Sequence, residues 1–366
     1  MSRARVAIVL VVLSIFLSIV NWPIYTALVD LFPFVSTTQR AALGGLLGGL
    51  SASFVLSTLI GMRYYNWLTR VYYVVTATWM GFVVYLFCAS MIYELLLLVH
   101  MPWSTQTGRG LVGASLLGGI YGLIHARRLH VKHVVVTLPK MVPSWRDKRV
   151  IFVSDFHLGQ LRGSSWARHV VATINSLPHD AVFIGGDLFD GTGAPDINEL
   201  IAPFKDLKAA TRTFVVTGNH EEFGDNSKFI AAIRACGLRV LMNEVAILDG
   251  LQIVGVDWAQ AANKEKFRGI LTSLGIDRER PSILLKHEPK DLDVASEAGI
   301  SLQLSGHTHR AQQWPLEYVA RRVYRGYAYG LKNYRDMPVY ISSGAGTWGP
   351  PMRVGTDCEV VVLTLA

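Results

Sequence analysis

The chain has 366 residues, of which 51% are hydrophobic and only 17% are charged. Residues 1–128 hold eight Lys and Arg and two Asp and Glu, whereas residues 129–366 hold 27 and 25. A nearly uncharged first third before an ordinary globular composition excludes a purely soluble enzyme, a disordered chain and a secreted disulfide scaffold. Cys88, Cys236 and Cys358 are odd in number and far apart, so they predict neither a disulfide framework nor a cysteine zinc site.

Four apolar stretches in the first third are long enough to cross a bilayer as helices, which takes about 20 residues. The first is too long for the apolar core of a typical signal peptide, and three more follow it, so we expect an uncleaved anchor. Glycines at four-residue spacing in the second and fourth stretches predict close helix packing within the chain. The stretches cover about residues 6–29, 41–62, 71–99 and 111–126, and predict a transmembrane domain of four helices over residues 1–128.

Basic residues beside these stretches indicate the orientation. From the N-terminus, the successive flanks and loops carry two, one, two, one and three Lys and Arg residues. Because positively charged loops stay in the cytoplasm, we expect a multi-pass inner- or plasma-membrane protein with a cytoplasmic N-terminus and catalytic domain. No charged residue lies at the centre of a stretch, which argues against a transporter or proton channel. The net charge of +8 comes mostly from these flanks, so no nucleic-acid partner is expected.

The rest of the chain alternates short β-branched runs with amphipathic segments, which is typical of a layered α/β domain. We expect this domain at residues 150–366, after a linker at residues 129–149 that contains prolines and basic residues. Strands are predicted at residues 150–154, 181–184, 213–217, 251–256, 282–285, 301–304, 339–342 and 359–365. Helices are predicted at residues 164–177, 197–209, 226–235, 263–274 and 292–298.

Polar groups follow five of the predicted strands, directly after each strand ends. Since ligands of open α/β sheets bind beyond the carboxyl ends of the strands, these groups are expected to share one crevice. Singly, each group also fits a turn, a helix cap or a buried core histidine. Taken together, however, several carboxylates and imidazoles in one crevice would cost a large free energy of burial unless cations neutralised them. In chain order the groups are Asp155 with His157, Gly186-Asp187, Asn219-His220-Glu221, His287, and His307 with His309.

Seven of these side chains are candidate metal ligands: Asp155, His157, Asp187, Asn219, His287, His307 and His309. They are too many for one tetrahedral ion and suit two divalent ions that share a bridging carboxylate, for which Asp187 is the natural candidate. Nitrogen and oxygen donors without thiolate suit Mn, Fe, Zn or Co, of which manganese is favoured. Asp155, His157 and His309 would complete one metal site, and Asn219, His287 and His307 the other.

In this order, the blocks D-x-H, G-D, G-N-H-E, a lone H and G-H-x-H resemble the calcineurin-like metallophosphoesterase superfamily. The resemblance covers about Val150 to Leu365 and implies a two-sheet α/β/β/α sandwich with two metal ions held by the ligands above. It also implies that His220 is the catalytic histidine, which contacts the phosphate and can protonate the leaving group. Glu221 or Asp190 is expected to accept a hydrogen bond from a ligating imidazole.

The chain is similar to the membrane-anchored branch of that family, through Leu138-Pro139 and the ending Ser343–Arg353. That branch includes hydrolases that cleave the pyrophosphate of UDP-diacylglucosamine. One departure is Arg310-Ala311, where the branch usually has two glycines. The departure leaves the ligands unchanged and bears on the substrate. Arg310 and Arg353 are therefore candidate substrate-binding residues.

These features predict a membrane-bound phosphohydrolase that cleaves a lipid or lipid-linked phosphodiester or pyrophosphate by attack of a metal-bridged hydroxide. Membrane lipids and the lipid-linked substrate are the expected partners. One alternative is a phosphodiesterase for soluble nucleotides that is merely anchored to the membrane. Another is a non-catalytic membrane sensor of metal or phosphate, against which the intact His220 argues.

The segment Tyr318–Arg335 interleaves five basic residues with five tyrosines. Basic groups attract anionic headgroups and tyrosines favour the membrane interface, so one interpretation is a membrane-facing flap. A second is a loop that stacks on a uridine or another nucleotide. The third is an ordinary amphipathic surface element.

Overall fold

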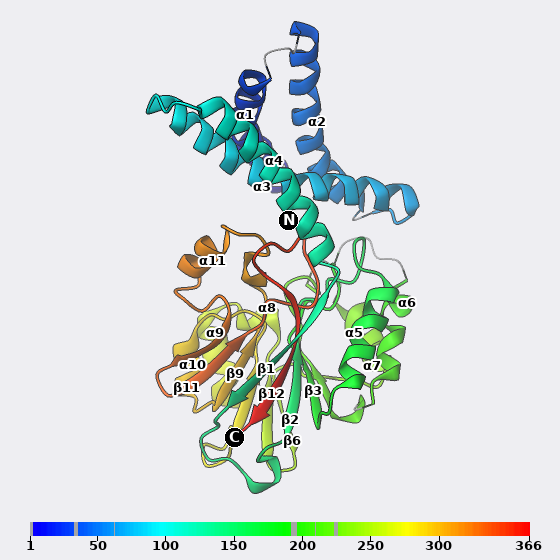
Figure 1. Cartoon of the computed structure of the whole chain (residues 1–366). Helices are drawn as coiled ribbons and strands as arrows, with labels where there is room; N and C mark the ends of the chain where they lie inside the picture. The colour runs from blue at the N-terminus through cyan, green and yellow to red at the C-terminus, as the bar shows by residue number, and fades with distance from the viewer. Residues whose placement is uncertain (1–2, 33–35, 62, 192–195, 209, 223–225) are drawn as a thin grey trace. The chain divides into compact units, whose positions relative to one another are not determined.

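The computed structural model describes residues 3–32, 36–61, 63–191, 196–208, 210–222 and 226–366. Met62 and Ala209, which end a predicted span and a predicted helix, lie outside the described residues. The chain divides into two compact units (Figure 1). One comprises Met1–His125 with Gly349–Val354, and the other comprises Ala126–Trp348 with Gly355–Ala366.

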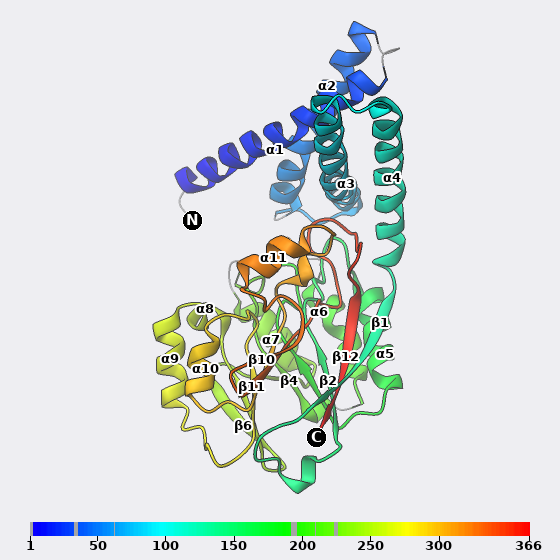
Figure 2. The same ribbon diagram turned by 60° about the vertical axis from the view of Figure 1, so that its left-hand side comes forward.

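The first unit is built from four helices, of which α3 and α4 run side by side (Figure 2). The four predicted apolar stretches are therefore helical. Among the described residues, α2 and α3 are long and apolar enough to cross a membrane. In α1, the segment Ile15–Leu31 is apolar but shorter than the other two. Two candidate spans are thus found, and four spans with cytoplasmic termini stay a prediction. The helices are α1 (Arg3–Leu31), α2 (Thr37–Gly61), α3 (Trp67–Leu98) and α4 (Ser104–His125).

Small residues bring α3 and α4 together, but not the glycines that spacing predicts. A Cβ at Gly119 would collide with the ring of Phe82, and one at Gly108 with Tyr93. By contrast, a Cβ at Gly118 would meet no described atom within 4 Å. Gly122, the other predicted glycine of this stretch, does pack closely, but against Val354 and not against α3. Gly48 is open, like Gly118, so close packing of the second stretch does not use that position.

The second unit contains two six-stranded sheets that lie face to face, with helices outside each (Figure 1). This arrangement confirms the predicted two-sheet α/β sandwich. The first sheet has the order β1-β12-β2-β3-β4-β5, with β1 (Leu129–Val136), β2 (Arg149–Val153), β3 (Ala181–Ile184), β4 (Thr213–Val215), β5 (Arg239–Val240) and β12 (Cys358–Leu365). The second has the order β10-β11-β9-β8-β7-β6, with β6 (Glu244–Leu248), β7 (Leu251–Gly255), β8 (Ser282–Leu285), β9 (Leu302–Ser305), β10 (Gly330–Tyr334) and β11 (Met337–Ile341).

Three hydrophobic layers hold this unit together. Between the sheets, Phe152, Phe183, Ile253 and Leu304 are among the fully buried residues. Strands buried on both faces read as continuous apolar runs, which is why the sequence pattern located most of them. The outer layers pack under two sets of helices, α5 (Ser164–Ser176), α6 (Ile197–Ile201) and α7 (Ser227–Ala235) on one side and α8 (Trp258–Ala261), α9 (Lys264–Ser273) and α10 (Leu292–Glu297) on the other.

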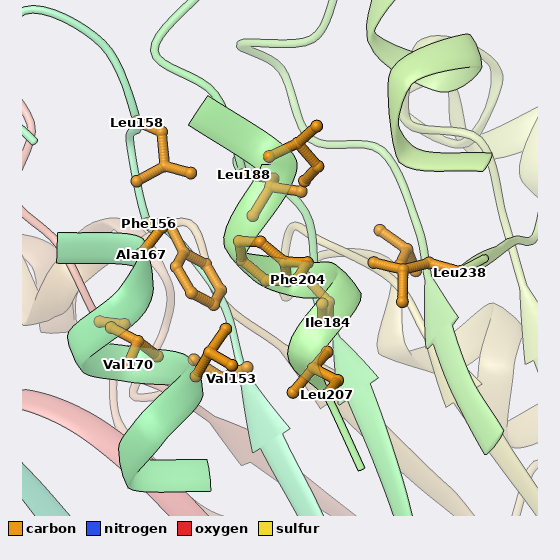
Figure 3. Packing of buried hydrophobic residues seen from close by; sticks show 14 of the residues in the cluster. Val153, Phe156, Leu158, Ala167, Val170, Ile184, Leu188, Phe204, Leu207 and Leu238 are labelled. Carbon is orange, nitrogen blue, oxygen red and sulfur yellow. The ribbon is translucent and has the colours of Figure 1, made fainter. Parts of the chain in front are cut away.

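Figure 3 shows part of the outer layer on the first sheet, where Val153 faces Val170 of α5 and Ile184 lies beside Phe204 and Leu207. Phe156 and Phe204 complete this contact, with ring centroids 5.3 Å apart. Phe156 lies between Asp155 and His157 in the sequence, so its burial fixes the backbone of the first polar block. Packing therefore positions a loop that carries candidate ligands.

The predicted linker at residues 129–149 is in part a strand. β1 pairs in parallel with β12, from Leu129 opposite Cys358 to Val136 opposite Leu365. Its basic residues and histidines weaken the apolar pattern, because one face of this edge strand is partly exposed. The pairing partner lies near the other end of the chain, so only tertiary contact could reveal this strand. Strands β5, β6 and β10 were likewise not predicted.

Glu359 on β12 joins the two sheets. Its side chain is fully buried and accepts hydrogen bonds from the hydroxyl groups of Tyr340 on β11, at 3.2 Å, and Tyr329, at 3.0 Å. The backbone N–H of Ser343 is a third donor, at 3.0 Å. Burial and the adjacent carboxylate raise the pKa of Tyr340 well above its usual value, so the tyrosine stays a donor.

We expect Glu359→Ala to destabilise the second unit by about 3 kcal/mol, because buried donors would lose their acceptor. Thermal unfolding of the full chain in detergent, followed by circular dichroism, measures the effect. Glu359→Gln, which keeps an acceptor oxygen of nearly the same shape, is the matched control and should melt closer to the unchanged protein. Equal melting of all three proteins would contradict this role.

Candidate metal centre

The loops that follow β2, β3, β4, β8 and β9 carry the predicted ligands. β2, β3 and β4 are parallel neighbours in one sheet, and β8 and β9 are parallel neighbours in the other. Several of these residues have a positive φ, which is uncommon for residues other than glycine and concentrates at functional sites. These are Asp155 (54°), His157 (49°), Asp187 (51°), His307 (70°) and His309 (49°).

Asp155, His157 and His309 form one group of potential ligands, with one donor atom from each lying within 4.8 Å of the others. The Nε2 atoms of His157 and His309 are 2.9 Å apart, and Nε2 of His309 is 3.5 Å from Oδ1 of Asp155. All three side chains are buried. Two imidazole nitrogens that face each other so closely require a proton or a cation to link them. The group therefore fits the first predicted metal ion.

Asp187, His287 and His307 form a second such group. Oδ2 of Asp187 is 3.1 Å from Nε2 of His287 and 3.7 Å from Nε2 of His157, so Asp187 lies between the two groups. Oδ1 of Asn219 is 2.8 Å from Nδ1 of His307. The structure thus brings all seven predicted donors together, with Asp187 in the position expected of a bridge.

Two acceptors orient the imidazoles of this cluster. Nδ1 of His287 lies 2.7 Å from the carbonyl oxygen of Gly185, and this contact turns Nε2 toward Asp187. Nδ1 of His157 lies 3.5 Å from Oδ1 of Asp190. Of the two acceptors predicted from the sequence, Asp190 is therefore the one beside an imidazole.

Glu221 contacts backbone instead. Its Oε2 accepts hydrogen bonds from the N–H groups of Gly218, at 2.7 Å, and Asp187, at 3.0 Å, and its Oε1 accepts one from Phe189, at 2.9 Å. Burial, together with the charge of Asp187, raises the pKa of Glu221 to about 7. Glu221 thus connects the loops after β3 and β4 and shapes the crevice without touching a ligand imidazole.

His220 lies at the edge of the first group, with its ring centroid 4.6 Å from that of His157. Its backbone N–H donates to Oδ1 of Asp187, at 2.9 Å, and its Nδ1 lies 2.8 Å from the carbonyl oxygen of Asp190. A carbonyl can only accept, so Nδ1 carries the proton in the neutral ring. Nε2 is therefore the nitrogen that gains a proton when the ring becomes charged. Burial and the nearby His157 lower the pKa of His220.

The electrostatics of the cluster show why cations fit it. Burial opposes a charge on His287, but the carboxylate of Asp187 prevails and raises the pKa of His287 to about 10. Burial and the charge on His287 lower the pKa of His307 to about 4. Burial also raises the pKa of Asp155. Without metal, protonated imidazole therefore compensates the buried carboxylates in part, a role that divalent ions would take over.

The residues after His309 form an unusual turn. Arg310, Ala311 and Gln312 have φ values of 50°, 57° and 59°, so three residues other than glycine continue the left-handed backbone of His309. The two positions at which the similar branch usually has glycines thus keep the conformation that glycine favours. Nε of Arg310 donates to Oε2 of Glu317, at 2.8 Å, and its guanidinium lies 4.7 Å from the ring centroid of Tyr329.

Arg353 does not join this cluster. It belongs to the segment Gly349–Val354 of the helical unit, where its backbone N–H donates to the carbonyl oxygen of Gly122, at 3.0 Å. Its side chain is fully buried. The structure therefore places Arg353 in the helical unit, and its contact with a substrate phosphate stays a prediction.

Two further side chains border the second group. Oε1 of Glu288 is 3.5 Å from Nε2 of His307, and the ring of Tyr324 lies edge-on to that imidazole, with the centroids 6.1 Å apart. Glu288 follows the lone histidine of the fourth block, so its nearness could have been inferred from the sequence. Tyr324 is distant from every block, and no sequence signal separated it from the neighbouring tyrosines.

Comparison with known proteins agrees with this geometry. Residues 148–311 match the family described as calcineurin-like phosphoesterase. A metallophosphoesterase from Helicobacter pylori J99 is 32% identical over 62% of this chain and 63% of its own length. A Bos taurus protein described as a transmembrane protein with metallophosphoesterase domain is 31% identical over 67% of this chain and 59% of its own length. The chain thus spans less than two thirds of the length of these relatives.

Among solved structures, a 5'-nucleotidase precursor from Thermus thermophilus is 14% identical and covers 59% of this chain and 54% of its own, with a TM-score of 0.36. A likeness at this level carries no information about the substrate. The family match, the order of the motifs and the two-sheet fold agree with one another. Residues 148–311 of the chain are thus similar to the calcineurin-like phosphoesterase family.

Proposed function

We propose that the chain is a membrane-bound dinuclear-metal phosphohydrolase. The observation that carries this proposal is the convergence of seven nitrogen and oxygen donors in two neighbouring groups, with Asp187 of the second group also close to His157 of the first. Metallophosphoesterase relatives support the metal-dependent hydrolysis of a phosphoester. Two divalent ions held by these residues would bind phosphoryl oxygens and lower the pKa of a bound water molecule, which makes a nucleophile near neutral pH.

The protein's own residues then orient the catalytic histidine and protonate the leaving group. Asp190 holds Nδ1 of His220 through its carbonyl oxygen. In the charged ring, Nε2 donates to a phosphoryl oxygen and passes its proton to the departing oxygen, as general acid catalysis requires. Trp348 borders His220, with ring centroids 5.8 Å apart, and is 51% exposed. An exposed indole beside the catalytic histidine suits an apolar or planar part of the substrate.

For the substrate we propose a lipid or lipid-linked phosphodiester or pyrophosphate, such as an acylated nucleotide sugar. The two apolar helices α2 and α3 and the transmembrane relative support membrane association. We further propose multiple spans and a cytoplasmic catalytic domain, on the distribution of basic residues in the sequence. With a lipid substrate, these helices would hold the enzyme in the same membrane as its substrate.

A soluble nucleotide is the second candidate. A cavity of about 410 Å³ is lined by Tyr324, Tyr327 and Tyr334, and also by Lys264 and Asp293, which form an ion pair at 2.7 Å. Its aromatic faces suit stacking on a nucleotide base. Because Tyr324 also contacts His307, a nucleotide in this cavity would have its phosphates close to the metal ligands.

Hydrolysis of the two substrate classes separates these candidates. We expect the purified full chain with Mn²⁺ to turn over an acylated nucleotide sugar in mixed micelles faster than the matching nucleotide sugar without acyl chains. Phosphate or nucleotide monophosphate release measures both reactions. Equal turnover would argue for the soluble substrate, with the helices serving only to locate the enzyme.

Asp187→Ala and His220→Ala test the metal centre. Both should abolish turnover, but only Asp187→Ala should greatly reduce the metal content, because Asp187 lies between both ligand groups whereas His220 acts on the substrate. Elemental analysis of purified protein and hydrolysis of bis(p-nitrophenyl) phosphate provide the two measurements. Unchanged turnover of Asp187→Ala would refute the proposed centre.

Arg310 is the residue that we propose to hold an additional substrate phosphate. Glu317 and Tyr329 fix its guanidinium, and its side chain remains 24% exposed. A non-glycine residue in the left-handed region costs roughly 1 kcal/mol. An arginine that occupies this position despite the cost favours a functional role for its charge.

Arg310→Gly and Ala311→Gly form a matched pair for this proposal. Both substitutions remove the steric cost of a side chain in left-handed backbone, but only Arg310→Gly removes a charge. We expect Ala311→Gly to raise the melting temperature and leave the KM for a pyrophosphate substrate unchanged, whereas Arg310→Gly raises that KM about tenfold, the value of one charge-assisted hydrogen bond. The same KM in both variants would exclude a substrate contact of Arg310.

A further inference from the structure

An exposed apolar surface covers α11 (Glu317–Val323) and the turn before it. We call it the α11 surface; its apolar members are Trp314, Leu316, Tyr318, Val319 and Val323, and its basic members are Arg321, Arg322 and Arg325. Val319 and Val323 are 60% and 61% exposed. Single exposed apolar residues are common on soluble proteins. A contiguous group that includes tryptophan and tyrosine and is bordered by arginines instead marks an interaction site.

Helical periodicity separates two faces of α11. Glu317 and Tyr324 are seven residues apart and therefore lie on the same side, which is the buried or half-buried side. Leu316, Val319 and Val323 lie three and four residues apart on another side, which is exposed. The helix thus presents an apolar stripe to the outside while its inner face packs on the domain.

The inner face packs directly on the loop that carries His307 and His309. Glu317 accepts a hydrogen bond from Arg310, at 2.8 Å, and Tyr324 lies edge-on to His307. The hydroxyl of Thr308 donates to the carbonyl oxygen of Ala328, at 2.7 Å, which ties the end of this segment to the same loop. Figure 2 shows α11 at the end of the domain at which β12 begins. Whatever binds the outer face is therefore about one helix diameter, roughly 10 Å, from the metal ligands.

The net positive charge of residues 314–335 favours a negatively charged partner. Between Trp314 and Arg335 there are five basic residues and one acidic residue, Glu317, which is already paired with Arg310. Arg321 packs over the ring of Tyr318, 6.0 Å from its centroid, so this pair presents an aromatic ring and a positive charge together. Apolar side chains beside arginine and aromatic rings are the composition of helices that lie in the interface of anionic membranes.

We propose that the α11 surface docks onto an anionic lipid bilayer, with its apolar stripe in the interfacial region and its arginines at the headgroup phosphates. Docking presents lipid phosphates next to the loop that holds His307, so the surface determines that the enzyme acts on substrates in the membrane plane. This last step rests on the proposed function. The docking itself does not, since binding is measurable without turnover.

The experiment places a fluorescent probe on the stripe of the full chain. Val319→Cys in a Cys88→Ser background is labelled with bimane, because Cys236 and Cys358 are buried. The protein is inserted in nanodiscs that contain doxyl-labelled lipid, either in phosphatidylcholine alone or in an equal mixture with phosphatidylglycerol. We expect quenching severalfold stronger in the anionic discs, and loss of that increase when Arg321 and Arg322 are both changed to Ser.

Ile247→Cys provides the matched control, since Ile247 is 56% exposed on the edge strand β6, outside the α11 surface. It should be quenched weakly in both discs. Equal quenching of the two labels, or equal quenching of the labelled Val319→Cys protein in the two discs, overturns the proposal. Protection of the label by added UDP without lipid quenching would assign the surface to a nucleotide and overturn it as well.

Hydrolysis of bis(p-nitrophenyl) phosphate by the same samples keeps the two proposals apart. Lipid-dependent quenching without any turnover supports the docking surface and contradicts the proposed hydrolase. Turnover without lipid-dependent quenching supports the hydrolase and contradicts the docking surface. Val319 contacts neither metal ligands nor His220 in the described contacts, so labelling it should leave this basal turnover intact.

Discussion

The cost of burying carboxylates and imidazoles together governs the architecture of the catalytic unit. Asp155 and Asp187 are fully or almost fully buried and lie beside five histidines of the same cluster. Such a cluster is unstable unless positive charge compensates it. A proton on His287 compensates it in part, and divalent ions bound by these residues would supply further positive charge. Surrounding features of the domain, from the tight loops to the burial of Phe156, serve to hold these groups in place.

The same constraint explains the backbone strain. Left-handed conformations at Asp155, His157, Asp187, His307 and His309 turn side chains of consecutive strands toward one centre. Hydrogen bonds from neighbouring loops hold this backbone, such as those that Glu221 accepts from the loops after β3 and β4. Strain of this kind persists only where the surroundings overdetermine it. The turn at Arg310 extends this strain beyond the ligands and links the loop that carries His307 and His309 to α11.

The α11 segment connects the chemistry to the outside of the domain. Its inner residues, Glu317 and Tyr324, contact the metal loop, while Val319 and Val323 remain exposed. One short helix thus carries both a face that packs against the loop of His307 and a face that is exposed. The five basic residues of this segment were visible in the sequence, which left a flap, a base-stacking loop and an ordinary surface equally open. The orientation of the exposed stripe favours the first of these.

The sequence by itself determined the two-part organisation, most of the buried strands and the identity of the polar groups at their ends. It could do so because these features are local: apolar runs, turn residues and short motifs are read within a few positions. It could not locate β1 against β12, Glu359 between the sheets, or Tyr324 beside His307, since each pairs residues far apart in the chain. Likewise, it did not reveal that Arg353 lies in a segment that belongs to the compact unit of the N-terminal helices. Only the folded chain decides which distant residues become neighbours, because that depends on how whole sheets and helices pack.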